Sequence, residues 1–168
     1  MKIRHMAMLA MYTTIALTIF TIESLLPGLA PVSGIKLGLA NIVTLWLLLY
    51  ASQKDAFLCL VMRILIASLI AGQMVSFAYS LCGGVFCFCT MAVLFRIFGK
   101  KYIVFISVIG AVFHNLGQIL IAVIVLQSFS ILSYLPLLTI SGIAAGTFTG
   151  LCTHYAAKRL TKDQVWLP

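Results

Sequence analysis

The hydrophobic positions of the chain run in long stretches that are separated by short polar breaks. A helix that crosses a bilayer needs roughly 20 mostly apolar residues, and the chain divides into six stretches of about this kind. They cover Met6–Leu26, Ile35–Ala51, Asp55–Gly72, Met74–Phe98, Tyr102–Gln127 and Leu132–Leu160. The pattern therefore predicts six transmembrane helices that form one membrane domain over residues 1–168.

The apolar runs do not alternate with polar residues, as the strands of a transmembrane barrel do; Ile119–Leu126 is apolar throughout. Composition agrees, because 63% hydrophobic residues, 8% charged residues and a mean hydropathy of +1.18 are outside the range of water-soluble domains. The first stretch follows Lys2 and Arg4, as a secretion signal would, but it is too long and no small-residue cleavage site follows. We expect an all-α integral membrane protein whose first stretch is its first helix.

The basic residues predict the orientation, because Lys and Arg concentrate in cytoplasmic loops. With the N-terminus inside, Lys36 is the only basic residue outside, and Arg63 falls within the membrane. The cytoplasmic segments then carry Lys2, Arg4, Lys54, Arg96, Lys100, Lys101, Lys158, Arg159 and Lys162. We expect both termini in the cytoplasm and a multi-pass protein of a bacterial cytoplasmic membrane. The net charge of +8 is then a topology signal rather than a sign of nucleic-acid binding.

Polar side chains within the apolar stretches are the candidate binding residues, since such groups are costly in the hydrocarbon region and usually face a protein interior or a watery cavity. Nearly all of them lie at or outside the expected midplane, Ser76 and Asn115 included, and the candidates for binding are Arg63, Asn41, His114, Gln118, Glu23, Gln73 and Tyr79. Their shared depth predicts a polar pocket open to the outside. Arg63 would hold an acidic or carbonyl group there, and Tyr79 would stack on a ring.

Structural roles for these residues stay open beside the binding role. Glu23 and Arg63 can form a buried ion pair that fixes helix packing. His114 and Gln118 lie one turn apart on one helix face and can serve packing alone, and Asn41 can bridge helices by hydrogen bonds.

Small residues predict where helices approach closely. Gly142, Gly146 and Gly150 repeat every four residues, which favours internal packing over a dimer contact. Gly83–Gly84 predicts a kink or close packing in the fourth stretch. Ala10 and Thr14 begin a weaker row on the first stretch that suits a partner protein. The segment Pro27–Gly34 contains two prolines and two glycines, and is either an external lid, a re-entrant turn or a tight connector.

The chain lacks the residues of most catalytic sites. Glu23, Asp55 and Asp163 are its only acidic residues, so it has no paired carboxylates and no aspartate-rich clusters for magnesium and diphosphate. The five cysteines show no metal-ligand spacing, and neither a nucleotide-binding loop nor a nucleophile elbow is present. We expect neither an enzyme nor a self-contained ATP-driven pump, and no metal or cofactor. Proton coupling through Glu23 or His114 stays open.

Four segments carry a family resemblance. They are Gly34–Thr44, which contains Lys-Leu-Gly-Leu-Ala-Asn; Tyr79–Gly84; Gly110–Gln118, which ends in His-Asn-Leu-Gly-Gln; and Tyr134–Pro136. They resemble the bacterial Gx transporter family, which has also been labelled heptaprenyl diphosphate synthase component I. That family in turn resembles the S components of energy-coupling factor (ECF) transporters.

The resemblance implies a six-helix protein that captures a vitamin or related compound from outside and works with a transmembrane coupling subunit and two ATPases. S components typically dock through an Ala-x-x-x-Ala face on the first helix, for which Ala10 with Thr14 is the nearest candidate here. The expected function is S-component-like uptake of a small molecule, such as an isoprenoid or quinone precursor or a vitamin-like compound. The alternatives are a non-catalytic membrane subunit associated with a prenyl diphosphate synthase and a proton-coupled secondary carrier.

Overall fold

A computed structural model of the chain describes residues 3–25, 36–72 and 74–159, and these are helical apart from short connections. The helices are α1 (Ile3–Leu25), α2 (Asn41–Tyr50), α3 (Gln53–Ala71), α4 (Met74–Phe98), η1 (Lys100–Tyr102), α5 (Ile103–Leu126), η2 (Phe129–Tyr134) and α6 (Leu135–Arg159). No strand occurs among the described residues. The prediction of an all-α protein is confirmed.

Helix length and composition support a multi-pass membrane protein. Among the described residues, four helical stretches are long and apolar enough to cross a bilayer: Ile3–Leu25, Met74–Phe98, Lys100–Leu126 and Phe129–Arg159. The 10 residues of α2 span only ~15 Å, about half of a typical hydrocarbon core. In α3, the charged residues Lys54, Asp55 and Arg63 interrupt the apolar run. The structure therefore supports several crossings, and six complete crossings stay a prediction.

The second helix is shorter than the sequence pattern predicts. Helix was expected from Ile35, which lies outside the described residues, but residues 36–40 are not helical and α2 begins at Asn41. Gly38 has a φ of +80°, in the left-handed region that a continuing right-handed helix excludes. The Asn41 N–H donates to the Gly38 carbonyl at 3.0 Å and closes a turn instead. A short non-helical segment therefore precedes α2.

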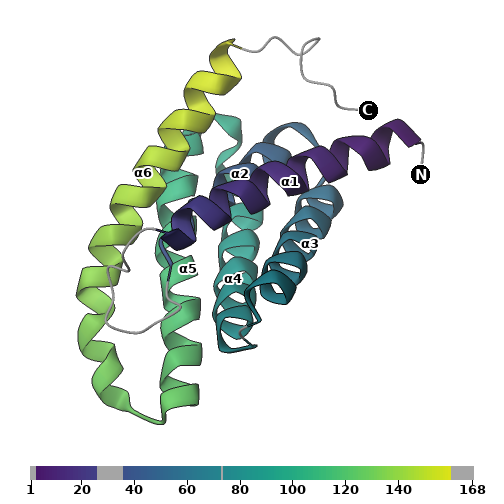
Figure 1. Ribbon diagram of the computed structural model, residues 1–168. Coiled ribbons are helices and arrows are strands. Elements are labelled where there is room, and N and C mark those ends of the chain that lie inside the picture. The colour runs from purple at the N-terminus through teal and green to yellow at the C-terminus, as the bar shows by residue number, and fades with distance from the viewer. Residues whose placement is uncertain (1–2, 26–35, 73, 160–168) are drawn as a thin grey trace.

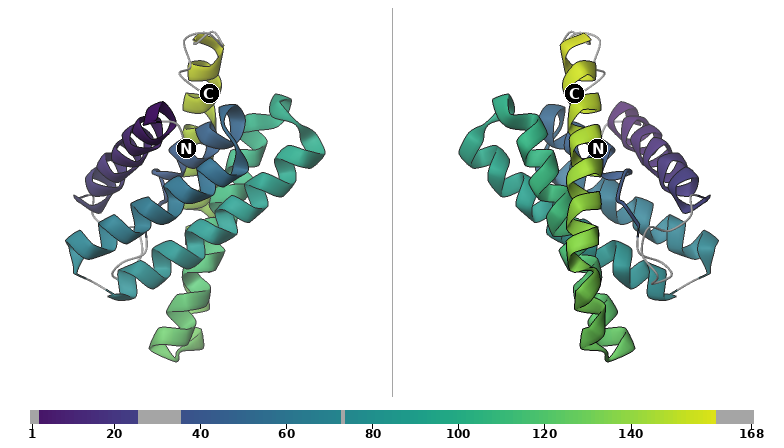
Figure 2. Two further views of the ribbon diagram at one scale, coloured as in Figure 1. Left: turned by 90° about the vertical axis from the view of Figure 1, so that its right-hand side faces the viewer. Right: turned by 90° about the vertical axis from the view of Figure 1, so that its left-hand side faces the viewer.

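Two groups of helices make up the molecule. In one group, α5 packs along both α4 and α6; in the other, α1 packs against α3 and α2 (Figure 1). Two helices join the groups: α3 packs against α4, and the short α2 contacts both α4 and α6. Figure 2 shows α1 on one side of the molecule and the junction of α4 with α5 on the other. The start of α1 and the end of α6 both lie in the upper part of Figure 1, as expected if both face the cytoplasm.

Glycines allow the close contact between α5 and α6. A Cβ atom at Gly146 would lie 2.6 Å from the Val108 Cα, and one at Gly150 would lie 2.8 Å from the Val104 Cα. The structure thus places the Gly142, Gly146 and Gly150 face inside the bundle. The helix α4 continues without interruption through Gly83 and Gly84, which lie against α5 and α3 respectively.

Candidate functional site

Buried polar side chains from α2, α3 and α5 meet in one network. The Arg63 Nη2 donates to the Asn41 Oδ1 at 3.4 Å. The Asn41 Nδ2 lies 3.3 Å from the His114 Nδ1, and the Gln118 Nε2 lies 3.1 Å from the His114 Nε2. All four residues are at most 5% exposed. The structure therefore brings together four candidate residues that lie far apart in the sequence, from Asn41 to Gln118.

Glu23, at the end of α1, connects this network to the segment before α2. Its carboxylate accepts from the backbone N–H of Gly38 at 2.6 Å and of Leu39 at 2.9 Å. The Gln118 Oε1 accepts from the Lys36 N–H at 3.3 Å. Side chains of α1 and α5 thus hold residues 36–39 in their non-helical path. A salt bridge between Glu23 and Arg63, which the sequence left open, is not formed between these two described residues.

Two glycines make room for the His114 ring. A Cβ at Gly38 would lie 2.7 Å from the His114 Cδ2, and one at Gly83 would lie 2.9 Å from the His114 Cε1. Any larger residue at either position would displace the ring. Both glycines belong to the segments that carried the family resemblance, so the sequence did contain this signal.

The hydrogen bonds around His114 have more donors than acceptors. The Asn41 Oδ1 and the Gln118 Oε1 already accept from Arg63 and Lys36, so both amide NH₂ groups point at the imidazole. A neutral imidazole has one acceptor nitrogen and cannot accept from both. If either side-chain amide is rotated by 180°, its oxygen can accept from the imidazole. Its NH₂ group then faces the donor of Arg63 or of Lys36, so two donors again face each other. One N–H of the network is therefore left without an acceptor.

Arg63 is the most unusual residue of the network. Its side chain is only 3% exposed, and its Nε is buried with no hydrogen-bond partner in the described part of the chain. Its Cζ lies 5.8 Å from the centre of the Phe20 ring, within the range of a cation–π contact. A guanidinium has five N–H donors and stays charged at any physiological pH. Among the described residues, one of these donors is hydrogen-bonded.

Lys36 is a member of the site that sequence reasoning missed. Its Nζ lies 3.5 Å from the centre of the same Phe20 ring and donates to the Ser24 Oγ at 2.5 Å. Burial lowers the pKa of Lys36 from its usual value; the Glu23 carboxylate opposes this shift and the Arg63 guanidinium adds to it. The sequence placed Lys36 on the outer side, at the start of the second predicted helix, and its position in the Lys-Leu-Gly-Leu-Ala-Asn segment was the available signal.

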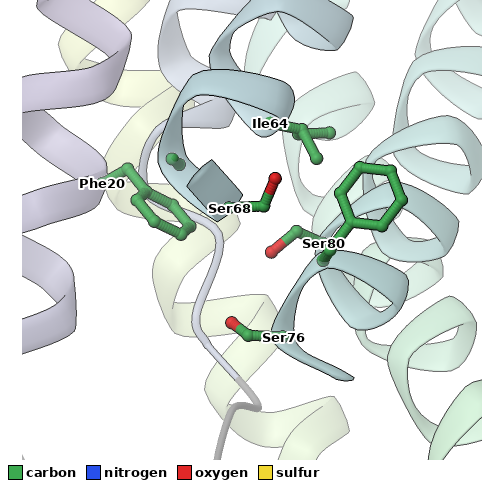
Figure 3. Close-up of a pocket in the computed structure, with 7 residues that line it drawn as sticks. Phe20, Ile64, Ser68, Ser76 and Ser80 are labelled. Carbon is green, nitrogen blue, oxygen red and sulfur yellow. The ribbon is translucent and has the colours of Figure 1, made fainter. Parts of the chain in front are cut away.

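A small pocket lies beside the network, between α1, α3 and α4 (Figure 3). The hydroxyl groups of Ser68, Ser76 and Ser80 point toward it, and the Phe20 ring forms one wall. The complete lining is Phe20, Ile64, Ala67, Ser68, Ser76, Phe77 and Ser80. Sequence reasoning did not select this pocket, although Ser76 and Ser80 lie one turn apart on α4.

Two other candidates are not brought into the network. Tyr79 is 1% exposed and packs in an apolar cluster with Ile119, Ala122, Ile131 and Leu138. No hydrogen bond joins it to Arg63 or to His114 among the described residues, so the expected stacking role has no support from its position. Gln73 lies outside the described residues.

Metal chemistry has no evident site in the described part of the chain. Residues 3–25, 36–72 and 74–159 contain no group of three or more His, Cys, Asp or Glu side chains that could hold a metal ion. What the network offers is a set of charged and hydrogen-bonding groups for non-covalent binding.

Comparison with known protein families gives one match. The family model described as heptaprenyl diphosphate synthase component I matches residues 12–156. The chain belongs to this family. The match includes every residue of the network, from Glu23 to Gln118, and confirms the resemblance seen in the sequence. No curated protein and no solved structure matches the chain. The family description names a component of a synthase, and the helices identify this component as a membrane protein.

Proposed function

We propose that this protein is an S-component-like membrane protein that captures a small molecule from the outer side of a bacterial cytoplasmic membrane. The observation that carries the proposal is Arg63, which is 3% exposed and has an unpartnered Nε. Polar groups within a membrane domain are costly and are usually retained for a function. Asn41, His114 and Gln118 converge on the same place, as the polar groups of a ligand site do.

The orientation of the site supports capture from outside. The described basic residues Arg4, Lys54, Arg96, Lys100, Lys101, Lys158 and Arg159 all lie near the helix ends that the charge rule assigns to the cytoplasm. Glu23 and Lys36 lie near the opposite helix ends, at the end of α1 and before α2. A ligand would therefore enter from the side away from the cytoplasm.

One face of α1 suits the docking of a coupling subunit. Ala10 and Thr14 are exposed, and Thr18 continues the row. The Thr14 hydroxyl donates to the Ala10 carbonyl and the Thr18 hydroxyl to the Thr14 carbonyl, each at 2.9 Å. Since these hydroxyls are satisfied within their own helix, the row is a smooth surface on which another transmembrane helix can pack.

The family description favours a second candidate, a non-catalytic membrane subunit that associates with a prenyl diphosphate synthase. In this case the partner supplies the catalytic residues, because the chain has only three acidic residues with which to bind magnesium. The network would then stabilise the fold rather than bind a ligand.

Copurification separates the two candidates. The chain is purified in mild detergent from cells that express its native partners, and the accompanying proteins and small molecules are identified by mass spectrometry. We expect a coupling subunit, two ATPases and a retained small molecule. Arg63→Ala and Gln118→Ala should lose the small molecule, whereas the exposed control Lys101→Ala should keep it.

A contrary result assigns a different function. Recovery of a prenyl synthase alone, with no small molecule, would reject the uptake proposal in favour of the synthase subunit. Uptake without any ATPase, abolished in Glu23→Gln, would indicate a proton-coupled carrier. Thr14→Leu tests the docking face, because it should remove the coupling subunit from the preparation and leave the small molecule bound.

A further inference from the structure

The charges around Phe20 do not balance. Lys36 and Arg63 both lie over its ring, at 3.5 and 5.8 Å from the ring centre. Glu23 is the acidic residue next to them, and its two oxygens accept from the backbone of Gly38 and Leu39. Two cations beside one carboxylate leave a net positive charge in a site where Arg63 and Glu23 are buried and Lys36 is half-buried. Buried charge that is not compensated is strongly unfavourable, so a negative partner is expected.

The hydrogen-bonding groups point to the same partner. Arg63 supplies donors only, and each of the Asn41 and Gln118 amides supplies two N–H groups and one oxygen. Both oxygens are occupied, His114 offers at most one acceptor, and the Arg63 Nε has no partner. This excess of donors does not depend on how the amides are turned. A ligand that completes the site must bring acceptor oxygens.

The neighbouring pocket has a different character. Its walls are mixed, because the rings of Phe20 and Phe77 and the Ile64 side chain are apolar and three serines lie among them. Ser76 and Ser80 are 8% and 6% exposed, and neither hydroxyl has a hydrogen-bond partner among the described residues. Phe20 connects this pocket with the cations, because its ring lines the pocket and contacts both charges.

We propose that the ligand is an amphiphilic anion. Its head, a carboxylate or a phosphate, binds Arg63 and Lys36, and its apolar part lies against Phe20 at the edge of the pocket between α1, α3 and α4, which is too small to enclose it. This inference rests on the proposed capture function and specifies the substrate class. A soluble metabolite and a lipid headgroup both provide this chemistry, and the experiment below distinguishes them.

The test uses the full chain in nanodiscs of phosphatidylcholine, with octyl phosphate as the probe and native mass spectrometry as the readout. We expect saturable binding of one octyl phosphate, at least about tenfold tighter than binding of inorganic phosphate or octanol. Arg63→Gln should weaken octyl phosphate binding about tenfold or more, equivalent to roughly 1.4 kcal/mol. Lys36→Gln should weaken it less, since Lys36 is only partly buried, and the control Lys101→Gln should have no effect.

A second set of nanodiscs that contain phosphatidylglycerol identifies the source of the anion. Loss of octyl phosphate binding in these nanodiscs would assign the site to a lipid headgroup, and unchanged binding would assign it to a soluble anion. Equal binding of octanol and octyl phosphate, or unchanged binding in both variants, would overturn the proposal. If Arg63→Gln does not fold, Lys36→Gln decides, because Lys36 lies outside the helices.

The outcomes also separate this inference from the proposed function. A neutral compound retained by the purified chain, together with failure to bind octyl phosphate, would refute the anion and leave small-molecule capture intact. Retention of no compound, together with failure to bind octyl phosphate, would refute both.

Discussion

His114 depends on the residues around it more than any other member of the network. It lies between the Asn41 and Gln118 amides, and the backbones of Gly38 and Gly83 approach the two edges of its ring. Gly38 has two separate reasons to be glycine: its φ is +80°, and a Cβ there would lie 2.7 Å from the His114 Cδ2. The two effects can be measured separately, because another glycine shares only the first.

Gly38→Ala should therefore destabilise the protein more than Gly99→Ala. Gly99 has a φ of +69°, but a Cβ added there would meet no atom within 4 Å, so its replacement adds only the left-handed strain of about 1–2 kcal/mol. Gly38→Ala adds the contact with the buried ring and should cost about 3 kcal/mol. Thermal unfolding of the purified variants in detergent measures the difference. Equal losses of stability would show that the ring moves aside freely.

At the scale of the elements, the contact between α5 and α6 is the clearest consequence of small residues. In membranes, helices associate through close packing rather than through the hydrophobic effect. The atoms nearest to a Cβ at Gly146 are the Val108 Cα at 2.6 Å and the Ser107 carbonyl oxygen at 2.9 Å. Backbone atoms cannot move aside as a side chain does, so a larger residue forces the two helices apart.

Gly146→Val should cost about 3 kcal/mol of stability, because it overpacks this contact. Ala144→Val is the matched control, since Ala144 is exposed on the same helix and receives the same side chain. The control should change stability by less than about 0.5 kcal/mol. Both are measured as shifts of the thermal unfolding midpoint in detergent. A similar loss of stability in both variants would contradict the role of the contact. The loss would then come from placing valine in the helix rather than from overpacking.

At the scale of the whole molecule, charge and structure agree on two distinct ends. The helix ends that carry Arg96, Lys101 and Arg159 form one end. The opposite end includes η2 (Phe129–Tyr134), in which no residue is charged. Translocating basic residues across the membrane is unfavourable, so the basic end should stay in the cytoplasm.

Cysteine labelling tests this orientation. In a variant whose native cysteines are replaced by alanine, Ser130→Cys and Lys101→Cys introduce exposed thiols at opposite ends. A membrane-impermeant maleimide should label Ser130→Cys in intact cells and Lys101→Cys only after the cells are opened. The reverse pattern would invert the orientation and move the proposed site to the cytoplasmic side.

The sequence by itself determined that this protein is helical and suited to a bilayer, and it predicted that its polar residues share one depth. Long apolar runs need a bilayer and helical backbone hydrogen bonding within it, and these are local properties of the chain. The helix from Met74 to Phe98 was predicted to the residue. The grouping of Arg63, Asn41, His114 and Gln118 was expected because they share one depth.

Only the tertiary structure decided which groups make contact. It delayed the start of α2 to Asn41, where Glu23 at the end of α1 binds the backbone of Gly38 and Leu39. It placed Tyr79 in an apolar cluster, and it brought Lys36 and Arg63 to one Phe20 ring. A hydrophobic pattern specifies where a residue lies along its own helix and which solvent it faces. The distance between side chains on different helices depends on how those helices pack.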